Sequence, residues 1–299
     1  MHSVFINRKP VQGAWGGGNL LVHAFYNLAP SLGIQIVDHP NKADVCFIAG
    51  IDPADGYPGA FQLLAHPKLL FRVNECDRRK NTQGLDEVIR KISSYSAHTV
   101  YVSNWLKNEI SCGSLNKSVI YNGCDAHIFT PTDEKYSKLN NKINIVCHHW
   151  SQNFWKGLQY YKFLKEFVSI NLKYTFTFIG RIELELTQAQ ANTIPNNSRH
   201  IQPLYGKVLG EELAKYDVCI NGSFFDPAPN SCRESISCGI PTYVNEAGGG
   251  GKEFAGARHT FTTNDDIVDI LSNPFTLNTY KPISWEQSIQ QYVDLIKTL

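Results

Sequence analysis

Residues 218–238 read VCINGSFFDPAPNSCRESISC, and this stretch decides the fold. Val218, Cys219 and Ile220 form a short apolar run of the kind that becomes a buried strand. A loop rich in proline and aromatic residues follows, and residues 231–238 then fit a short helix. A strand, a loop and a helix in this order make the repeating unit of parallel sheets, because parallel strands need a crossover between them.

The same alternation extends over the whole chain. Expected strands cover residues 4–6, 34–37, 45–48, 69–73 and 99–102 in the first half, and 143–147, 174–179, 218–220 and 241–244 in the second. Expected helices cover residues 21–28, 85–92, 104–110, 157–168, 210–216, 231–238 and 266–271, with a last helix after Ser284. Strands that alternate with helical patterns predict an α/β fold with two doubly wound, Rossmann-like domains.

A polar segment divides the two halves. Pro131 opens a run of turn-forming and charged residues that reaches Lys142, which is typical of a linker. We therefore expect an N-terminal Rossmann-like domain over residues 1–138 and a C-terminal one over residues 139–280. A capping box at Ser284 to Gln287 opens a helix within residues 281–299, which is expected to pack toward the N-terminal domain. Ligands of such sheets bind beyond the carboxyl ends of the strands, so we expect a site in a cleft between the halves.

Composition excludes several classes of protein. Of the 299 residues, 28 are Lys or Arg and 27 are Asp or Glu, so the net charge of +1 gives no basic footprint for nucleic acid. No apolar run reaches the ~18 residues of a membrane-spanning helix, although peripheral membrane contact stays open. The eight cysteines contain no C-x-x-C pair, which predicts reduced thiols and no metal site. The first residues lack signal-peptide features, so we expect a cytoplasmic protein.

A glycine-rich loop precedes the first helix. Gly13 to Gly18 would let backbone N–H groups approach a phosphate at the helix N-terminus. Asp38 follows about twenty residues later, which is similar to a dinucleotide-binding fingerprint. The gap between the first strand and Gly13 is too long for that motif. The loop is therefore interpreted either as a phosphate- or sugar-facing loop or as a surface loop.

Two carboxylates lie close to the helix that follows the strand at 218–220. Asp226 falls in the loop and Glu234 in the first turn, and the backbone amides of Asn230, Ser231 and Cys232 lie between them. A helix N-terminus beside two acids suits a polar, phosphate-bearing ligand. Ser231-x-x-Glu234 also matches a capping box, so Glu234 could serve its own helix instead.

Two further segments follow strands at the same expected edge. Lys156 precedes a helix, where it could meet a diphosphate as a point charge. His148 and His149 have no ligand partner at metal-site spacing, so a hydrogen-bonding role is favoured. After the strand at 69–73, the loop contains the candidate acceptor-side residues Asn74, Asp77 and Arg78, together with the carboxylate of Glu75.

These segments together resemble the GT-B-fold glycosyltransferases, most closely family 4. The resemblance runs from the glycine loop through the stretches at 99–106, 119–125 and 129–131, then Lys156-Gly157, residues 178–181, residues 226–241 and 284–286. Its most specific parts are Asn122-Gly123-Cys124-Asp125 with Phe129-Thr130-Pro131, and the acid-x7-Glu element with Cys238-Gly239-Ile240-Pro241.

The resemblance implies a role for each matching residue. Asp226 would lie near the hydroxyls of the donor sugar, Glu234 near the nucleotide ribose, and Lys156 at the phosphate. The amides of residues 230–232 would approach the sugar and diphosphate. Gly16, Gly17 and Gly18 would touch the diphosphate or the acceptor. Nucleotide contacts are expected between Arg181 and Tyr205.

This chain departs from the family pattern at three places. The first acid of the family motif is Asp226 rather than glutamate. The family's arginine falls on Ser151, where Arg181 is a candidate replacement. Asn74 and Glu75 stand where the family often has a histidine, and Glu75 is the candidate catalytic group there.

The activity implied by the resemblance is retaining, metal-independent transfer of a sugar from a UDP- or GDP-sugar to a glycan hydroxyl. The nucleotide sugar is then a co-substrate, and no cofactor is expected. Two alternatives stay open. One is an NAD(P)-dependent sugar-nucleotide enzyme of Rossmann type, based on the glycine loop and Asp38. The other is a non-catalytic module that binds a nucleotide sugar or a glycan.

Overall fold

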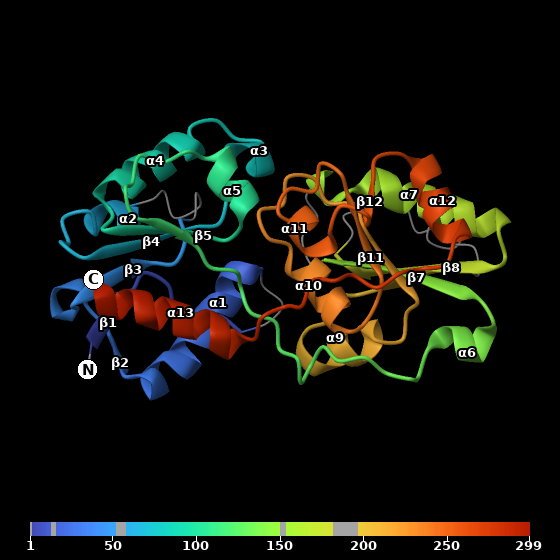
Figure 1. The fold of residues 1–299 in the computed structure, drawn as a ribbon, viewed down its shortest axis with the longest axis horizontal. Helices are drawn as coiled ribbons and strands as arrows, with labels where there is room; N and C mark the ends of the chain where they lie inside the picture. The colour runs from blue at the N-terminus through green and yellow to red at the C-terminus, as the bar shows by residue number, and fades with distance from the viewer. Residues whose placement is uncertain (1, 13–15, 52–57, 150–153, 182–196) are drawn as a thin grey trace. The chain divides into compact units, whose positions relative to one another are not determined.

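The computed structural model describes residues 2–12, 16–51, 58–149, 154–181 and 197–299. The chain forms two compact units. Unit 1 contains residues 1–123 and 283–299, and unit 2 contains residues 124–282. Each unit is an α/β layer structure around one parallel sheet (Figure 1).

The boundary between the units lies earlier than the expected residue 138. Residues 124–138 belong to unit 2 because they pack on it. Phe129 is buried in the unit 2 core. The Lys135 ammonium donates to the carbonyl oxygens of Ala214 and Tyr216 at 2.6 and 3.0 Å. The segment therefore has the composition of a linker but packs on the surface of unit 2.

Unit 1 has six parallel strands in the order β2-β1-β3-β4-β5-β6. The strands are β1 (His2–Ile6), β2 (Ile34–Val37), β3 (Val45–Ile48), β4 (Leu69–Val73), β5 (His98–Tyr101) and β6 (Lys117–Val119). Its helices are α1 (Gly17–Leu28), α2 (Pro58–Gln62), α3 (Asp77–Lys80), α4 (Leu85–Tyr95), α5 (Asn104–Glu109) and α13 (Trp285–Thr298). Every residue of β3 and β4 is buried, as expected for strands covered on both faces.

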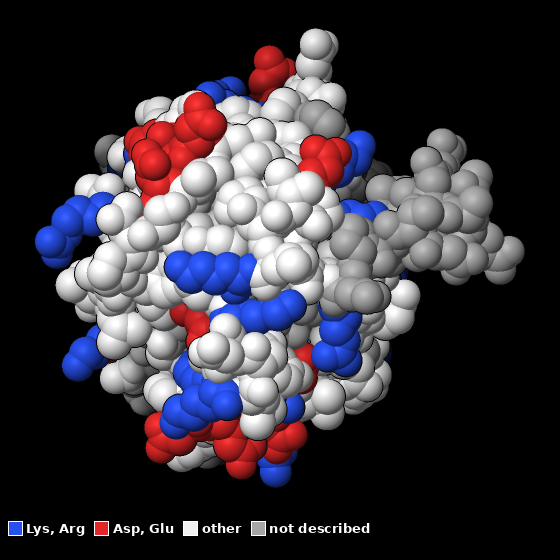
Figure 2. Space-filling view, turned by 90° about the vertical axis from the view of Figure 1, so that its right-hand side faces the viewer, with Lys and Arg blue, Asp and Glu red and all other residues white. Residues whose placement is uncertain are grey.

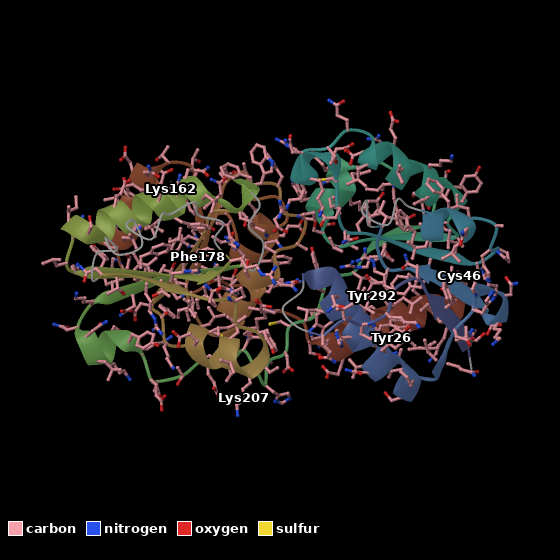
Figure 3. The ribbon with its side chains drawn as sticks, turned by 180° about the vertical axis from the view of Figure 1, so that it is seen from behind. Tyr26, Cys46, Lys162, Phe178, Lys207 and Tyr292 are labelled. Atoms are coloured by element: carbon pink, nitrogen blue, oxygen red, sulfur yellow. The ribbon has the colours of Figure 1, made fainter. Side chains whose placement is uncertain are left out.

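The C-terminal helix α13 completes the core of unit 1. It lies beside α1 on one face of the sheet, whereas α2, α4 and α5 lie on the other (Figure 1). Its apolar stripe, Ile289, Tyr292, Val293 and Ile296, is fully buried against α1 and the sheet. Tyr292 points into this layer (Figure 3), and the centroid of its ring lies 5.4 Å from the centroid of the Phe47 ring.

Unit 2 has the order β12-β11-β10-β7-β8-β9, again with every pairing parallel. The strands are β7 (Ile143–His149), β8 (Tyr174–Gly180), β9 (Ser198–Ile201), β10 (Val218–Asn221), β11 (Thr242–Asn245) and β12 (Thr260–Phe261). Its α-helices are α6 (Tyr136–Asn140), α7 (Leu158–Ile170), α9 (Gly206–Leu213), α10 (Asn230–Ser237), α11 (Gly251–Ala255) and α12 (Asn264–Ser272).

Both sheets confirm the predicted α/β class with two Rossmann-like units. In each, the chain reverses its direction of travel across the sheet at one point, between β1 and β3 in unit 1 and between β7 and β10 in unit 2. Adjacent helices leave on opposite faces there, so the loops part and expose the carboxyl ends of the strands. These two points are where ligand-binding residues are expected.

The junction of α13 with unit 1 gives a stability test. A Cβ atom on Gly123 would lie 2.4 Å from the Trp285 Cα and 2.5 Å from its nitrogen. Because backbone must move to admit it, Gly123→Ala should lower the free energy of unfolding of unit 1 by about 1–3 kcal/mol. Gly113→Ala is the control, since nothing lies within 4 Å of its Cβ position. Equal thermal unfolding midpoints in calorimetry would contradict the tight junction.

Candidate functional site

The loops after β7 and β10 meet at the reversal point of unit 2. Gly157 makes this approach possible, because a Cβ atom there would lie 2.3 Å from the carbonyl oxygen of Gly222. Gly157 also has a φ of 85°, in the left-handed region that favours glycine. The contact brings Lys156, at the end of a 3₁₀ turn over Phe154–Lys156, to the loop that contains Asp226.

Lys156 and Asp226 form a buried ion pair, with the Lys156 Nζ 2.5 Å from the Asp226 Oδ2. The Asp226 backbone is held as well, since its carbonyl oxygen accepts from the Gly250 amide at 2.9 Å. Phe225, just before it, has a left-handed φ of 52°. The sequence places both residues at the carboxyl edge of the sheet but does not show that they neutralise one another.

Helix α10 begins beside this pair, at Asn230. Pro229 is its N-cap, so Ser231 lies inside the first turn and the capping-box alternative for Ser231 and Glu234 is wrong. The Ser231 hydroxyl instead accepts from the Asn221 side-chain amide at 2.9 Å, which ties α10 to the end of β10. Cys232 is fully buried. The first amides of a helix are not used by its own backbone ladder, so an anion can be bound at this end of α10.

Glu234 faces His148, the penultimate residue of β7. The Glu234 Oε2 lies 3.7 Å from the His148 Nδ1, and the two side chains are 13% and 4% exposed. Burial raises the pKa of the Glu234 carboxyl to about 7, although Arg233 lowers it. Burial lowers the pKa of His148 to about 4, so its ring is neutral at pH 7. His148 is a site residue to which the sequence assigned only a hydrogen-bonding role.

Arg233 is a buried cation next to Glu234. Its guanidinium lies over the Phe254 ring at 5.0 Å and donates to the side-chain oxygen of Asn230. Burial lowers its pKa. Nothing in the spacing of the sequence distinguishes Arg233 from an exposed helical arginine, so sequence reasoning missed it.

The remaining unit 2 candidates lie on neighbouring loops. Arg181 follows β8 and is exposed, and Tyr205 is the exposed N-cap of α9. Arg181 thus follows β8 and Tyr205 follows β9, which are the first and second strands beyond β7 in the sheet. Most of the segment between them, residues 182–196, and Ser151 lie outside the described residues.

A second group of candidates gathers at the reversal point of unit 1. Gly16 is the N-cap of α1, and Gly17 and Gly18 form its first turn. A Cβ atom on Gly18 would lie 3.7 Å from an Arg8 guanidinium nitrogen and 3.8 Å from the Asn74 side-chain nitrogen. The structure thus brings Gly18, Asn74 and Arg8 together, although Arg8 carries no sequence signal. Gly13 lies outside the described residues.

The buried side chain of Arg72 is connected to this group by hydrogen bonds. It donates to the carbonyl oxygen of Ala49 at 3.0 Å and to the side-chain oxygen of Asn122 at 2.9 Å. Asn122 donates in turn to the carbonyl oxygen of Gly17 at 3.5 Å. Arg72, which lies in the strand predicted over residues 69–73, is therefore a structural anchor of the glycine turn.

The other acceptor-side candidates have structural partners. The Asp77 carboxylate accepts from the backbone amides of Gly84, Leu85 and Asp86, which stabilises the start of α4. Burial raises the pKa of Asp77, but its hydrogen bonds outweigh burial and leave the pKa below its usual value. Arg78 is exposed and lies 3.4 Å from Glu109. Glu75 lies 3.3 Å from the Lys80 ammonium.

Other features bear on the classes considered from sequence. Asp38 has an 82% exposed side chain paired with Lys42 at 3.0 Å. All eight cysteines are buried free thiols. Within the described ranges, no three His, Cys, Asp or Glu side chains gather as a metal site. None of the helices described combines the length and apolarity needed to cross a bilayer. Figure 2 shows basic and acidic side chains interspersed over the face in view.

Several solved structures that are similar to this chain in fold are glycosyltransferases. A sucrose-phosphate synthase from Thermosynechococcus elongatus matches with a TM-score of 0.72 at 11% identity, covering 99% of this chain and 95% of the synthase. An α-glucosyltransferase in complex with UDP and a 13-mer DNA matches at 0.60 and 14% identity, covering 99% of each chain. A trehalose-6-phosphate synthase, studied for glycosyl transfer with retention, matches at 0.60 and 12% identity, covering 94% of this chain and 78% of that one.

No known family profile matches the sequence, and no curated protein matches it either. The likeness to the solved structures is one of fold. It confirms the expected resemblance to the GT-B glycosyltransferases at that level.

The acid facing His148 gives a prediction for stability against pH. With a folded pKa of about 7, Glu234 keeps its proton where an unfolded glutamate, at 4.5, has lost it. Its contribution to the free energy of unfolding therefore falls as pH rises from about 4.5 to 7. Glu234→Gln should remove this fall, about 1.4 kcal/mol per pH unit at full effect. Urea unfolding at several pH values measures it.

Glu166→Gln, on the exposed side of α7, is the control for that experiment. A pH dependence that is the same in wild type, Glu234→Gln and Glu166→Gln would show that Glu234 is not held protonated in the folded chain.

Proposed function

We propose that this chain is a retaining, metal-independent glycosyltransferase that moves a sugar from a UDP- or GDP-sugar to a glycan hydroxyl. The observation that carries the proposal is the convergence of Lys156, Asp226, Glu234 and the α10 N-terminus at the reversal point of unit 2. The fold shared with glycosyltransferases supports it. The solved structures with UDP and on transfer with retention support the donor class and the stereochemistry.

In this proposal unit 2 binds the donor. The α10 amides and the Lys156 ammonium approach the diphosphate, Asp226 approaches the sugar hydroxyls, and Glu234 approaches the ribose. Because Lys156 is paired with Asp226, the diphosphate competes with a carboxylate for the same ammonium. Donor binding then loosens the pair and releases Asp226 toward the sugar. Amides and an ammonium held in place stabilise the charge that develops on the leaving phosphate.

The transfer step balances without a cofactor. The bond from the anomeric carbon to the β-phosphate oxygen breaks, and the electron pair leaves with the nucleoside diphosphate. The acceptor hydroxyl attacks from the same face and forms the new glycosidic bond, and its proton passes to the departing phosphate. In unit 1, the turn at Gly16 to Gly18 with Arg8 and Asn74 is the proposed acceptor-side surface.

The direct test incubates the protein with a panel of UDP- and GDP-sugars in EDTA and measures release of free nucleotide. Release with one donor, lowered at least tenfold by Glu234→Ala, supports the proposal. Binding of every donor without release would show a binding module. Fluorescence transfer from tryptophan to bound NAD(P)H would favour the sugar-nucleotide oxidoreductase or epimerase alternative. Release only after a divalent ion is added would contradict metal independence.

The ion pair gives a sharper prediction. Asp226→Asn removes the anion that competes for Lys156, so the affinity for free UDP or GDP should rise at least threefold. Sugar transfer should fall at least tenfold, because the carboxylate that faces the sugar is lost. Titration calorimetry and nucleotide release measure the two effects.

Asp265→Asn, on the exposed start of α12, is the matched control and should change neither quantity. Unchanged nucleotide affinity in folded Asp226→Asn would show that Lys156 does not meet the diphosphate. Undiminished transfer would remove Asp226 from the reaction.

A further inference from the structure

The proton on the His148 ring can be assigned from its neighbours. The His148 Nε2 lies 3.0 Å from the backbone carbonyl oxygen of Ser231 and 3.2 Å from the Ser235 hydroxyl. A carbonyl oxygen can only accept a hydrogen bond, so the Nε2 carries the proton and donates it. In the neutral ring, the Nδ1 is then a bare lone pair.

That lone pair faces an acid in a largely buried position. The Glu234 Oε2 lies 3.7 Å from the Nδ1, and both side chains are almost fully buried. If Glu234 were a carboxylate, two lone pairs would face each other with little solvent between them. With a proton on Glu234, its O–H group can donate to the Nδ1 lone pair instead. The hydrogen bond forms when the Oε2 and Nδ1 atoms, now 3.7 Å apart, approach by less than 1 Å.

The surrounding charges agree with one proton held on the acid. Lys156 disfavours a charged His148 ring, and burial lowers its pKa more strongly. Arg233, on the same helix, favours the Glu234 carboxylate but does not offset burial. The Cys124 and Cys238 thiols also interact with Glu234, and burial raises the pKa of each to about 12, so they stay neutral.

We propose that His148 and Glu234 share a single proton, and that His148 is thereby the positioning residue that holds the Glu234 carboxyl for its ligand. The link from β7 to α10 through Ser231 orients the ring, and the ring orients the acid. The assignment of a nucleotide as that ligand rests on the proposed function. The shared proton does not.

Nitrogen-15 NMR of the ligand-free, full-length protein tests the shared proton directly. The His148 ring should be the Nε2–H tautomer from pH 5.5 to 8.5. Its Nδ1 resonance should shift as Glu234 loses its proton near pH 7. In Glu234→Gln, whose amide is a permanent donor to Nδ1, the resonance should not shift with pH. An Nδ1–H tautomer, an imidazolium at pH 7, or an Nδ1 shift that ignores Glu234 would overturn the proposal.

Binding of UDP and GDP tests the positioning. His148→Gln keeps an amide donor for the Ser231 carbonyl but removes the lone pair that faces Glu234. Its dissociation constant at pH 6.5 should rise at least fivefold for whichever nucleotide binds. Because the nucleotide itself ionises, the affinity of the wild type is divided by the affinity of Glu234→Gln at each pH. This ratio should fall as the pH rises through 7. In His148→Gln the midpoint of this change should move to lower pH, because the protonated acid loses the acceptor for its O–H group while burial still acts on it.

His259→Gln is the matched control, because His259 is also buried and bonded to a carbonyl oxygen, that of Thr276 at 2.8 Å. It should leave nucleotide affinity and its pH dependence unchanged. A similar loss of affinity in both histidine variants, or a folded His148→Gln that binds as wild type, would contradict the positioning role. If neither nucleotide binds the wild type, the proposed function fails while the NMR result stands on its own.

Discussion

A buried ion pair between Lys156 and Asp226 is the constraint around which unit 2 is arranged. Isolated charges are strongly disfavoured in an interior, so each of these residues is stabilised by having the other within contact distance. Two loops separated by 70 residues must therefore meet. The close approach of Gly157 to Gly222 and the left-handed backbone at Phe225 are the local conformations that allow it. The proposed function uses the same pair.

Unit 1 also buries a cation, Arg72, beneath its own reversal point. The terminal nitrogens of Arg72 donate to a carbonyl oxygen and an amide oxygen, and through Asn122 the residue reaches the glycine turn of α1. The two units thus share sheet architecture and use their reversal points differently. One gathers a paired acid and base with a second acid on a helix. The other presents a glycine turn beside Arg8 and Asn74.

The sequence predicted the strands that are buried on both faces and the class of fold. It did not show β6, β9 or β12, because the edge strands β6 and β9 are mostly polar and β12 has only two residues. Asp226, Glu234 and Lys156 could be placed on one sheet edge because parallel strands end together. Their partners could not be foreseen, because ion pairing and the contact of His148 with Glu234 depend on backbone geometry between distant segments.

The position of α13 has a consequence for the order in which the two units fold. Unit 2 interrupts unit 1, since α13 follows residue 282 in the chain yet fills the core beside α1. During synthesis, residues 1–123 emerge before α13, which together with α1 covers one face of their sheet. Unit 2 is complete before that helix exists. Unit 2 can therefore fold before unit 1, because the core of unit 1 is completed only after α13 has been synthesised.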